Sequence, residues 1–430
     1  MDKTKTITIT PRMFLNKPFI TCPKCGKKEF GVLMINSYNY VRRCAECRHD
    51  ESYSLPRLSR KVIYVDQFAI SDMMKSINPH VGKMSKVDPF FRTLFEKLDR
   101  LNKLQLIICP DSQNHFNESL VSPFYSALKR LYEQLSHGTT FYDPGTIKRF
   151  EITNNFFEWI GDKKEPLDIG DILMGDNLDG WQGRFIISVS LRDQDPQLVT
   201  DIRKERDTSS KNLEKVFSRW QTENKKTYND WYEEEASSFG KSIFENYIRG
   251  LGHYKALSEG KLPINMSTIS SFLSESSITI TYIHGKLRDK GYDEDKVLNT
   301  SLKYFNSEEL KKLPYVKISS ALFASLAREA AQGRKKPPTK GMMNDIEVIA
   351  SYAPFCDALF IDNECRRFLS NRDVKNKYDI SSKVFSRDNK EEFIDYLDEI
   401  EKSASETHIN LVKKVYGDDW GKPFTEMFEE

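Results

Sequence analysis

The segment KVIYVDQFAISDMM, residues 61–74, joins a strand pattern to a carboxylate at the end of the strand. Residues 62–65 form a continuous run of β-branched and aromatic side chains, which is typical of a parallel strand covered on both faces. Asp66 therefore falls at the carboxyl end of the strand, the edge where open α/β sheets bind ligands. An aspartate also commonly caps the next helix, so both interpretations stay open until other acids are located.

The composition is that of a globular chain with room for two or three domains. The chain has 430 residues, of which 39% are hydrophobic and 30% charged, unlike the composition of a disordered protein. No segment approaches the roughly 18 apolar residues of a membrane-spanning helix, and the first residues lack the apolar region of a signal peptide. We therefore expect no membrane association and a cytoplasmic location.

Four of the seven cysteines form two C-x-x-C pairs. Cys22 and Cys25 make the first pair, Cys44 and Cys47 make the second, and 18 residues separate the pairs. This spacing is typical of a four-cysteine zinc site, and the intervening residues read as two strands around a turn. Disulfides are the alternative, although they are rare in cytosolic proteins. The pattern predicts a zinc ribbon over residues 1–56 with a closed, structural Zn²⁺ site.

The ribbon is also the basic end of the chain. The net charge is +2 overall, but residues 1–61 carry 13 Lys and Arg against 5 Asp and Glu, a net of +8 that leaves −6 for the remainder. Basic groups among exposed rings contact phosphate and bases, or are simply solvated. The ribbon residues expected to contact nucleic acid are Lys24, Lys27, Lys28, Arg42 and Arg43. A proline-containing basic loop at 334–341 adds Arg334, Lys335 and Lys336.

Beyond the ribbon, strand and helix patterns alternate in two separated parts of the chain. The first part predicts a helix after Asp88-Pro89, a buried strand over 104–109 and a helix opened by Pro110 and Asp111. The second part predicts helices over 319–333 and 344–353, strands at 357–362 and 383–385, and a last helix introduced by a capping box of Asp388 and Glu391.

The residues between these parts have a different character. They are polar, rich in aromatic residues and mostly helical by period, with strand-like runs at 185–191 and 278–283. The predicted division of the chain is a ribbon at 1–56, a first α/β part at 61–124, a helical insertion at 125–315, a second α/β part at 316–401 and a tail at 402–430.

Four acids occupy comparable places in the two α/β parts. Asp66 and Asp362 end strands, Glu118 lies in the helix after the second strand, and Asp345 opens a late helix. Each alone has an ordinary interpretation as a cap, turn or surface residue. In a parallel sheet, however, all four places share one edge, and carboxylates buried together without compensation are costly. Oxygen ligands suit Mg²⁺ or Mn²⁺, and such ions activate water for phosphodiester hydrolysis.

Four further residues are weaker candidates. Asp111 lies on the same helical face as Glu118, whereas Asp357 stands at the opposite end of its strand. His115 could contact phosphate, and His49 could ligate zinc beside Cys47, although core or surface positions are equally ordinary for a histidine.

A family resemblance rests on four motifs: YVDQFAIS (64–71), ICPDSQNHFNES (108–119), NDIEVIASYAPFCDALFIDN (344–363) and KVFSRDNKEEFIDYL (383–397). In this order they resemble the PIN-domain family of metal-dependent nucleases, over residues 61–120 and 318–400. The resemblance implies a parallel sheet flanked by helices and Mg²⁺- or Mn²⁺-dependent cleavage, usually of single-stranded RNA. It also implies that the metal-binding catalytic acids are Asp66, Glu118, Asp345 and Asp362.

The expected fold class is therefore α/β, with a PIN-like sheet split by a large helical insertion and preceded by a zinc ribbon. The hypothesis for function is an endonuclease with structural zinc and catalytic magnesium or manganese, acting on RNA in preference to DNA. Many PIN-like proteins of prokaryotes are toxins or defence effectors, and such a role needs restraint by an inhibitor, a partner protein or a homo-oligomer. The alternative is a non-catalytic nucleic-acid-binding or scaffold protein with the same fold.

Overall fold

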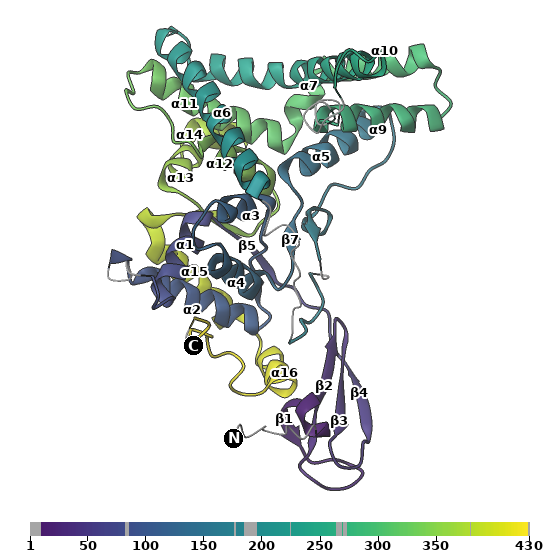
Figure 1. Ribbon diagram of the computed structural model, residues 1–430, viewed down its shortest axis with the longest axis vertical. Helices are drawn as coiled ribbons and strands as arrows, with labels where there is room; N and C mark the ends of the chain where they lie inside the picture. The colour runs from purple at the N-terminus through teal and green to yellow at the C-terminus, as the bar shows by residue number, and fades with distance from the viewer. Residues whose placement is uncertain are drawn as a thin grey trace, which may run out of the picture.

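The computed structural model describes residues 10–81, 86–175, 178–184, 196–223, 225–263, 269, 273–378 and 380–428. In these residues the chain is a mixed α/β protein with a four-stranded antiparallel sheet, a four-stranded parallel sheet, a two-stranded sheet and many helices. Figure 1 shows the antiparallel sheet at one end of the molecule, the parallel sheet in the middle and the long helices at the other end.

The strands are β1 (Asn16–Ile20), β2 (Phe30–Asn36), β3 (Asn39–Cys44), β4 (Asp50–Ser54), β5 (Lys61–Val65), β6 (Ile107–Ile108), β7 (Thr140–Phe141), β8 (Leu173–Met174), β9 (Ala358–Phe360) and β10 (Lys383–Phe385). The α-helices are α1 (Gln67–Ile77), α2 (Phe90–Lys103), α3 (Gln113–Leu120), α4 (Tyr125–Ser136), α5 (Pro144–Trp159), α6 (Pro196–Thr222), α7 (Tyr228–Ser258), α9 (Glu275–Asp289), α10 (Glu294–Phe305), α11 (Pro314–Ala331), α12 (Met342–Tyr352), α13 (Asn363–Leu369), α14 (Arg372–Lys377), α15 (Lys390–Ser403) and α16 (Glu406–Tyr416). Short 3₁₀ turns are η1 (Pro11–Phe14), η3 (Ile169–Ile172), η4 (Glu308–Lys312) and η5 (Arg387–Asn389).

The parallel sheet has the strand order β10-β9-β5-β6, and every neighbouring pair in it is parallel. The predicted parallel sheet is therefore confirmed. In β5, side chains alternate between the faces: Val62 and Tyr64 join one hydrophobic cluster, whereas Ile63 and Val65 join another. Because a period of two sends successive side chains to opposite faces, the continuous apolar run in the sequence reflects burial on both sides.

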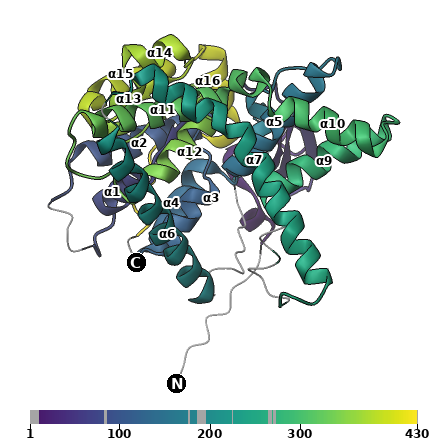
Figure 2. The same ribbon diagram turned by 90° about the horizontal axis from the view of Figure 1, so that it is seen from above.

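Helices cover the two faces of the parallel sheet. The face of Ile63 and Val65 packs against α1, α2, α4 and α15. The face of Val62 and Tyr64 is continuous with apolar side chains of α5, α6, α7, α11 and α12. Figure 2 shows the long helices α6 and α7 from above, in front of the rest of the molecule.

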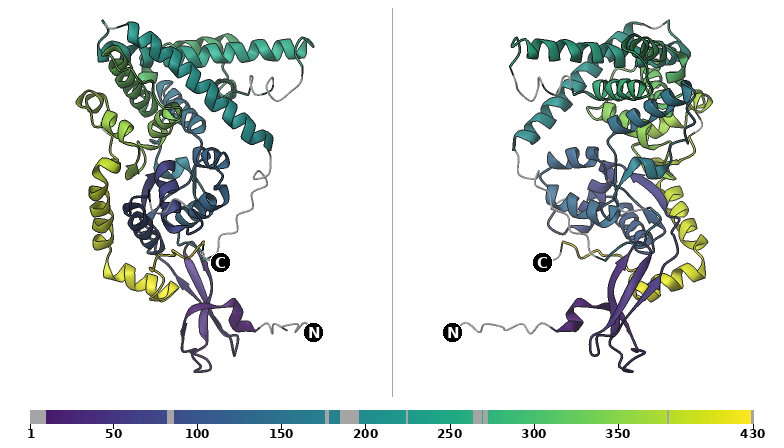
Figure 3. Two further views of the ribbon diagram at one scale, coloured as in Figure 1. Left: turned by 60° about the vertical axis from the view of Figure 1, so that its left-hand side comes forward. Right: turned by 90° about the vertical axis from the view of Figure 1, so that its right-hand side faces the viewer.

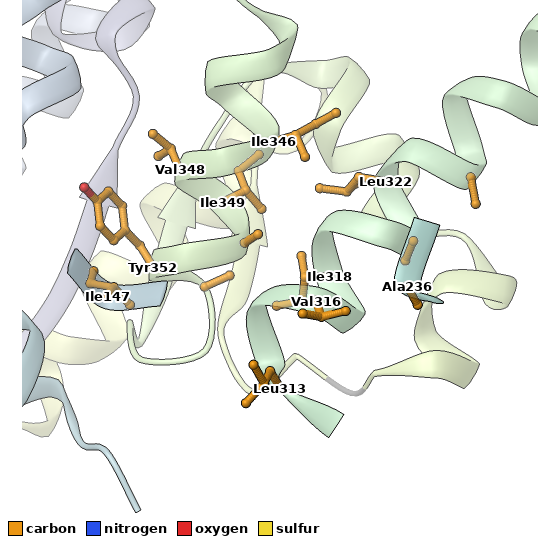
Figure 4. Packing of buried hydrophobic residues seen from close by; sticks show 14 of the residues in the cluster. Ile147, Ala236, Leu313, Val316, Ile318, Leu322, Ile346, Val348, Ile349 and Tyr352 are labelled. Carbon is orange, nitrogen blue, oxygen red and sulfur yellow. The ribbon is translucent and has the colours of Figure 1, made fainter. Parts of the chain in front are cut away.

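The helices of residues 144–331 share this second core with the sheet. Figure 4 shows Ile318 and Leu322 of α11 beside Ile346 and Ile349 of α12, whose Tyr352 lies near Ile147 of α5. A single cluster therefore runs from β5 to the long helices, and the helical region is fixed to the sheet by apolar packing.

The antiparallel sheet has the order β1-β2-β3-β4 and packs on α16. Val32 and Tyr40 of this sheet share a cluster with Trp181, Val415 and Tyr416. The chain end continues across α2, where Trp420 donates from its indole nitrogen to the carbonyl of Lys103 at 3.0 Å. Residues after α15 thus hold the ribbon against the α/β body.

Several predicted boundaries differ from the structure. The strand expected over 104–109 is limited to Ile107–Ile108, since Leu104 ends α2. Helix α3 begins at Gln113 and is capped by the Ser112 hydroxyl, not opened by Pro110 and Asp111. The predicted capping box of Asp388 and Glu391 is wrong, because the Ser386 side chain caps η5 and α15 follows from Lys390.

The strand expected at 278–283 is also wrong: these residues lie inside α9. The Ser274 hydroxyl accepts from the backbone nitrogen of Ser277 and starts the helix, and Ile280, Ile283 and Leu287 are buried at helical spacing. Tertiary packing therefore overrides the β-branched preference of this segment. The other expected strand, at 185–191, lies outside the described residues.

Arg42, one of the residues expected to contact nucleic acid, is instead buried, with 1% of its surface exposed. Its guanidinium donates to the carbonyls of Pro18 at 2.7 Å, Phe30 at 3.0 Å and Lys414 at 2.7 Å. It therefore ties β3 to β1, β2 and α16, and its charge is not presented to a ligand.

Replacing Arg42 by methionine should destabilise the protein by about 2–4 kcal/mol, because three buried carbonyl oxygens lose their donor. The measurement is urea unfolding followed by circular dichroism. Arg43→Ala is the matched control, since the neighbouring side chain is partly exposed, and a shift below about 0.5 kcal/mol is expected there. Equal losses in the two variants would contradict the assigned role of Arg42.

Candidate metal centres

The four cysteines of the ribbon lie close enough to bind one ion. The Sγ atoms of Cys22 and Cys47 are 3.6 Å apart, as are those of Cys25 and Cys44, and all four Sγ atoms lie within 4.8 Å of one another. A tetrahedral zinc site with bonds of about 2.3 Å needs sulfur separations of about 3.8 Å. The cluster could therefore hold Zn²⁺, and four protein sulfurs would leave no open position for a substrate.

The two C-x-x-C turns have the same backbone geometry. The nitrogen of Gly26 donates to the carbonyl of Cys22 at 2.9 Å, and that of Arg48 to the carbonyl of Cys44 at 3.1 Å. Both donors have a left-handed backbone, with φ of 75° at Gly26 and 57° at Arg48. Cys22 and Cys44 each donate from their own nitrogens to the carbonyl five residues later, both at 2.8 Å. Two equivalent turns therefore aim two thiols each at one point.

The remaining basic candidates divide into exposed and engaged groups. Lys24, Lys28, Lys335 and Lys336 are exposed and Arg43 is partly exposed. Lys27 pairs with Glu46 at 2.8 Å on the exposed surface. Arg334 differs from the expectation, because its guanidinium pairs with Glu329 at 3.0 Å and also with Glu364. This loop residue therefore braces α11 against α13 and has little freedom to bind phosphate.

Asp66 and Asp362 follow two neighbouring parallel strands. Val65 of β5 pairs with Phe360 of β9, and the nitrogen of Asp66 donates to the carbonyl of Phe360 at 2.9 Å. In the order β10-β9-β5-β6, the chain leaves β5 for β6 on one side and returns as β9 on the other. The carboxyl ends of β5 and β9 thus flank the topological switch point, the place where α/β sheets bind ligands.

Both aspartates also cap helices, so the capping interpretation and the site interpretation are compatible. Oδ1 of Asp66 accepts from the nitrogen of Phe68 at 3.4 Å. Oδ1 of Asp362 accepts from the nitrogens of Glu364 at 2.7 Å and Cys365 at 3.0 Å. Its other oxygen, Oδ2, is buried and has no hydrogen-bond partner in the described part of the chain. A buried carboxylate oxygen of this kind is suited to a cation.

Asp345 and Glu118 approach the same edge from helices. Asp345 lies in the first turn of α12, and it forms with Asp362 and Cys365 a group whose ligand atoms lie within 4.8 Å of one another. Glu118 lies in the last turn of α3. Its Oε1 is 3.4 Å from Nη2 of Arg206, which comes from α6.

The pKa shifts indicate that the four carboxyl groups lie in one another's electric field. Burial raises the pKa of Asp66 to about 7, and the nearby charges of Glu118 and Asp362 add to the rise. Burial also raises the pKa of Asp345 well above its ordinary value, with contributions from Asp66, Asp362 and Glu118. The pKa of Glu118 is raised by burial and held down in part by Arg206. A divalent cation would relieve this repulsion.

Sequence reasoning missed two residues of this centre. Arg206 is distant in sequence from every acid, and no local pattern marks it. Cys365 is fully buried, and its Sγ belongs to the group with Asp345 and Asp362. The signal available was its position three residues after Asp362, on the helix that Asp362 caps.

The weaker candidates have structural positions. His115 is buried with its ring stacked against Tyr64 and Tyr132, at centroid distances of 5.3 and 4.9 Å, and burial lowers its pKa to about 4. Asp357 precedes β9, at the amino ends of the parallel strands and away from the four acids. There its Oδ2 accepts from the nitrogen of Val62 at 2.9 Å. His49 contacts Glu51 at 3.0 Å.

Asp111 is partly buried and forms an isolated β-bridge with Thr140. Burial raises the pKa of its carboxyl group.

Comparison with protein-family models, with curated proteins and with solved structures finds no match. In the part of the chain that the structure describes, no helix is both long and apolar enough to cross a membrane.

Substitutions at the two cysteine turns should have opposite effects on metal retention. Gly26→Val should release Zn²⁺ at a lower concentration of competing chelator, because φ of 75° is strained for a β-branched residue. A Cβ added at Gly26 meets no atom within 4 Å. The substitution therefore tests the strain of the left-handed backbone and not a steric clash of the Cβ. Arg48→Gly, at the equivalent position, should retain Zn²⁺ as well as or better than the wild type. Equal retention by both variants would contradict the assigned turn geometry.

Without added Mg²⁺ or Mn²⁺, stability should fall as pH rises from about 4 to about 7. Asp66 keeps its proton up to about pH 7 in the folded protein, but its ordinary pKa is 3.8, so unfolding releases a proton in this window. Above about pH 7 Asp66 is ionised in both states, so the contribution of its pKa shift to the loss is complete. Asp66→Asn should flatten the dependence and stabilise the protein at pH 8 by about 1–3 kcal/mol. Urea unfolding at pH 5 and pH 8 measures both effects; parallel pH profiles for the two proteins would refute the assignment.

Proposed function

We propose that this protein is a metal-dependent endonuclease that hydrolyses nucleic acid, with single-stranded RNA favoured over DNA. The observation that carries the proposal is the gathering of Asp66, Glu118, Asp345 and Asp362 around the switch point between β5 and β9. Such a set of oxygen ligands suits Mg²⁺ or Mn²⁺, with Asp362 Oδ2 as an unpartnered buried ligand atom. The thiol of Cys365 is a soft donor beside them.

The main contribution of the acids would be to hold ligand oxygens in fixed positions around a metal ion. Asp66 and Asp362 are held by strand pairing and helix capping, so their carboxylates are fixed before a ligand arrives. When bound, Mg²⁺ or Mn²⁺ would supply an activated water and would neutralise charge on the phosphate oxygens. Arg206 is the nearby cation: the pairing to Glu118 holds its guanidinium at the edge where a phosphate would approach.

The resemblance of four motifs to the PIN-domain family supports this proposal. The motifs at 64–71, 108–119, 344–363 and 383–397 fall on β5 and α1, β6 and α3, α12 and β9, and β10 and α15. Residues 125–315 would then be the insertion in such a core, and the ribbon would present Lys24, Lys28 and Arg43 to the nucleic-acid backbone. A role as a prokaryotic toxin or defence effector in the cytoplasm is consistent with this chemistry.

The alternative is a nucleic-acid-binding or scaffold protein without catalysis. The observation in its favour is that Asp66 and Asp362 have ordinary capping roles. Such a protein would bind RNA through the ribbon and would leave it intact.

The test is incubation of labelled single-stranded RNA and DNA with the purified protein, with Mg²⁺, with Mn²⁺ or without added divalent cation. We expect cleavage that depends on the metal and falls at least about 10³-fold in Asp66→Asn and in Asp345→Asn. Asp289→Asn is the matched control, because this exposed acid lies on α9. Intact RNA with every metal, together with ribbon-dependent RNA binding, would establish the scaffold alternative.

A further inference from the structure

The second half of α7 has a solvent-exposed face that is not explained by the sheet or by the proposed site. Figure 3 shows α6 and α7 diverging from the turn that joins them, so that α7 extends away from the α/β body. Along one side of this extension, exposed residues recur at intervals of 4, 3, 4, 3 and 4 positions. They are Lys241, Glu245, Ile248, Gly252, Lys255 and Glu259.

This spacing keeps the six residues on one narrow stripe of the helix, because the average interval of 3.6 residues equals one helical turn. The stripe spans about 27 Å at 1.5 Å per residue. The opposite side of the helix carries Gly250, which is buried, and Ile243, which is partly buried. Five side chains and the backbone at Gly252 are exposed to solvent, and these six residues form the α7 stripe.

The α7 stripe is complementary to itself when two copies run antiparallel. The interval sequence reads the same in both directions, so a two-fold axis level with residue 250 places Lys241 opposite Glu259. The same operation places Glu245 opposite Lys255. Each stripe thus offers two basic and two acidic groups, and all four would meet an opposite charge on a second copy.

Within one chain, the ion pairs between residues of the α7 stripe are long and exposed to solvent. Lys241 and Glu245 are 3.7 Å apart and Lys255 and Glu259 are 4.0 Å apart, with both lysine side chains more than 70% exposed. Lys261 also pairs with Glu259, at 2.6 Å. Exposed pairs of this kind contribute little to folding, so their charges can reorient toward a partner at small cost.

The middle of the stripe suits close contact between helices. Ile248 is 51% exposed, and the same two-fold operation places it opposite Gly252 of the second copy. A Cβ added at Gly252 would meet no atom within 4 Å, so the notch is open. Leu251 is 46% exposed beside the stripe, and Tyr282 of the neighbouring α9 is 48% exposed. Apolar surface at the centre with charge pairs toward the ends is the usual arrangement of an interface.

We propose that two copies of this chain associate through the α7 stripe in an antiparallel, two-fold symmetric dimer. The occupant is a second copy because the same positions supply both halves of every contact. The inference does not depend on the proposed nuclease activity, since none of the candidate metal ligands lies on α7.

The experiment is sedimentation-velocity analysis of the full chain over a series of protein concentrations, at low and high salt. We expect a monomer–dimer equilibrium that weakens as salt screens the charge pairs. Monomer at every concentration would overturn the proposal.

Two substitutions test the face. Gly252→Gln should weaken dimerisation at least tenfold, because the larger side chain fills the notch that receives Ile248. The thermal midpoint should stay equal or rise, since glutamine favours a helix more than glycine does. Lys255→Glu should weaken dimerisation similarly, by placing two acidic groups together.

A charge exchange provides the rescue. The variant with Lys241→Glu, Glu245→Lys, Lys255→Glu, Glu259→Lys and Lys261→Glu keeps an opposite charge in every one of these pairs, within the chain and across the axis, and should dimerise like the wild type. It should not form mixed dimers with wild-type chains, because like charges would then meet. A dimer that survives Gly252→Gln and Lys255→Glu, or that mixes freely with the exchanged variant, would overturn the assignment of this face.

Discussion

The pairing of β5 with β9 is the constraint on which the candidate centre depends. Val65 lies beside Phe360, and the hydrogen bond from Asp66 to Phe360 carries the pairing one residue past the strand end. A parallel strand covered on both faces has no freedom to slip, because a shift of one residue would send Val62 and Tyr64 into the opposite core. The positions of Asp66 and Asp362 are thus set by apolar packing that neither carboxylate takes part in. Helix capping then fixes the side-chain direction, since one oxygen of each carboxylate accepts backbone N–H groups.

The same packing makes the centre electrostatically unfavourable without a ligand. Four acids lie near the carboxyl ends of β5 and β9, and burial together with mutual repulsion raises the pKa of Asp66 and of Asp345. Arg206 is the cation that opposes this charge. One guanidinium at 3.4 Å from Glu118 offsets part of the repulsion and leaves Asp362 Oδ2 without a partner. A cluster of buried acids lowers the free energy of unfolding, and clusters that destabilise the fold in this way are typical of binding sites and active sites.

The sequence pattern was sufficient to predict the features that depend on residues close together in the chain. Two C-x-x-C pairs specify two equivalent turns, and an apolar run ending in aspartate specifies a strand end, so the cysteine cluster and the placements of Asp66 and Asp362 follow from the sequence. Features decided by distant contacts did not follow. Residues 278–283 have a strand-like composition but are helical because α5, α7 and α10 surround them. The sequence indicates that Arg42 is a surface charge. In the structure it is buried, and it donates hydrogen bonds to carbonyl groups of three separate segments. Arg206 reaches Glu118 only because α6 crosses back over α3, which no periodicity encodes.

The helical region is therefore more than an appendage between two halves of an α/β core. Its apolar side chains continue the core that covers Val62 and Tyr64, and its helix α6 supplies Arg206 to the four acids and Asp207 to Lys340 of the basic loop, at 2.9 Å. Because the loop leads directly into α12, this ion pair and Arg206 both act on the end of the helix that carries Asp345. Any movement of α6 relative to α12 would change the charge around Glu118 and Asp345 together. Helix α6 consequently contributes to the charge around the acids, whereas the α7 stripe belongs to a different helix.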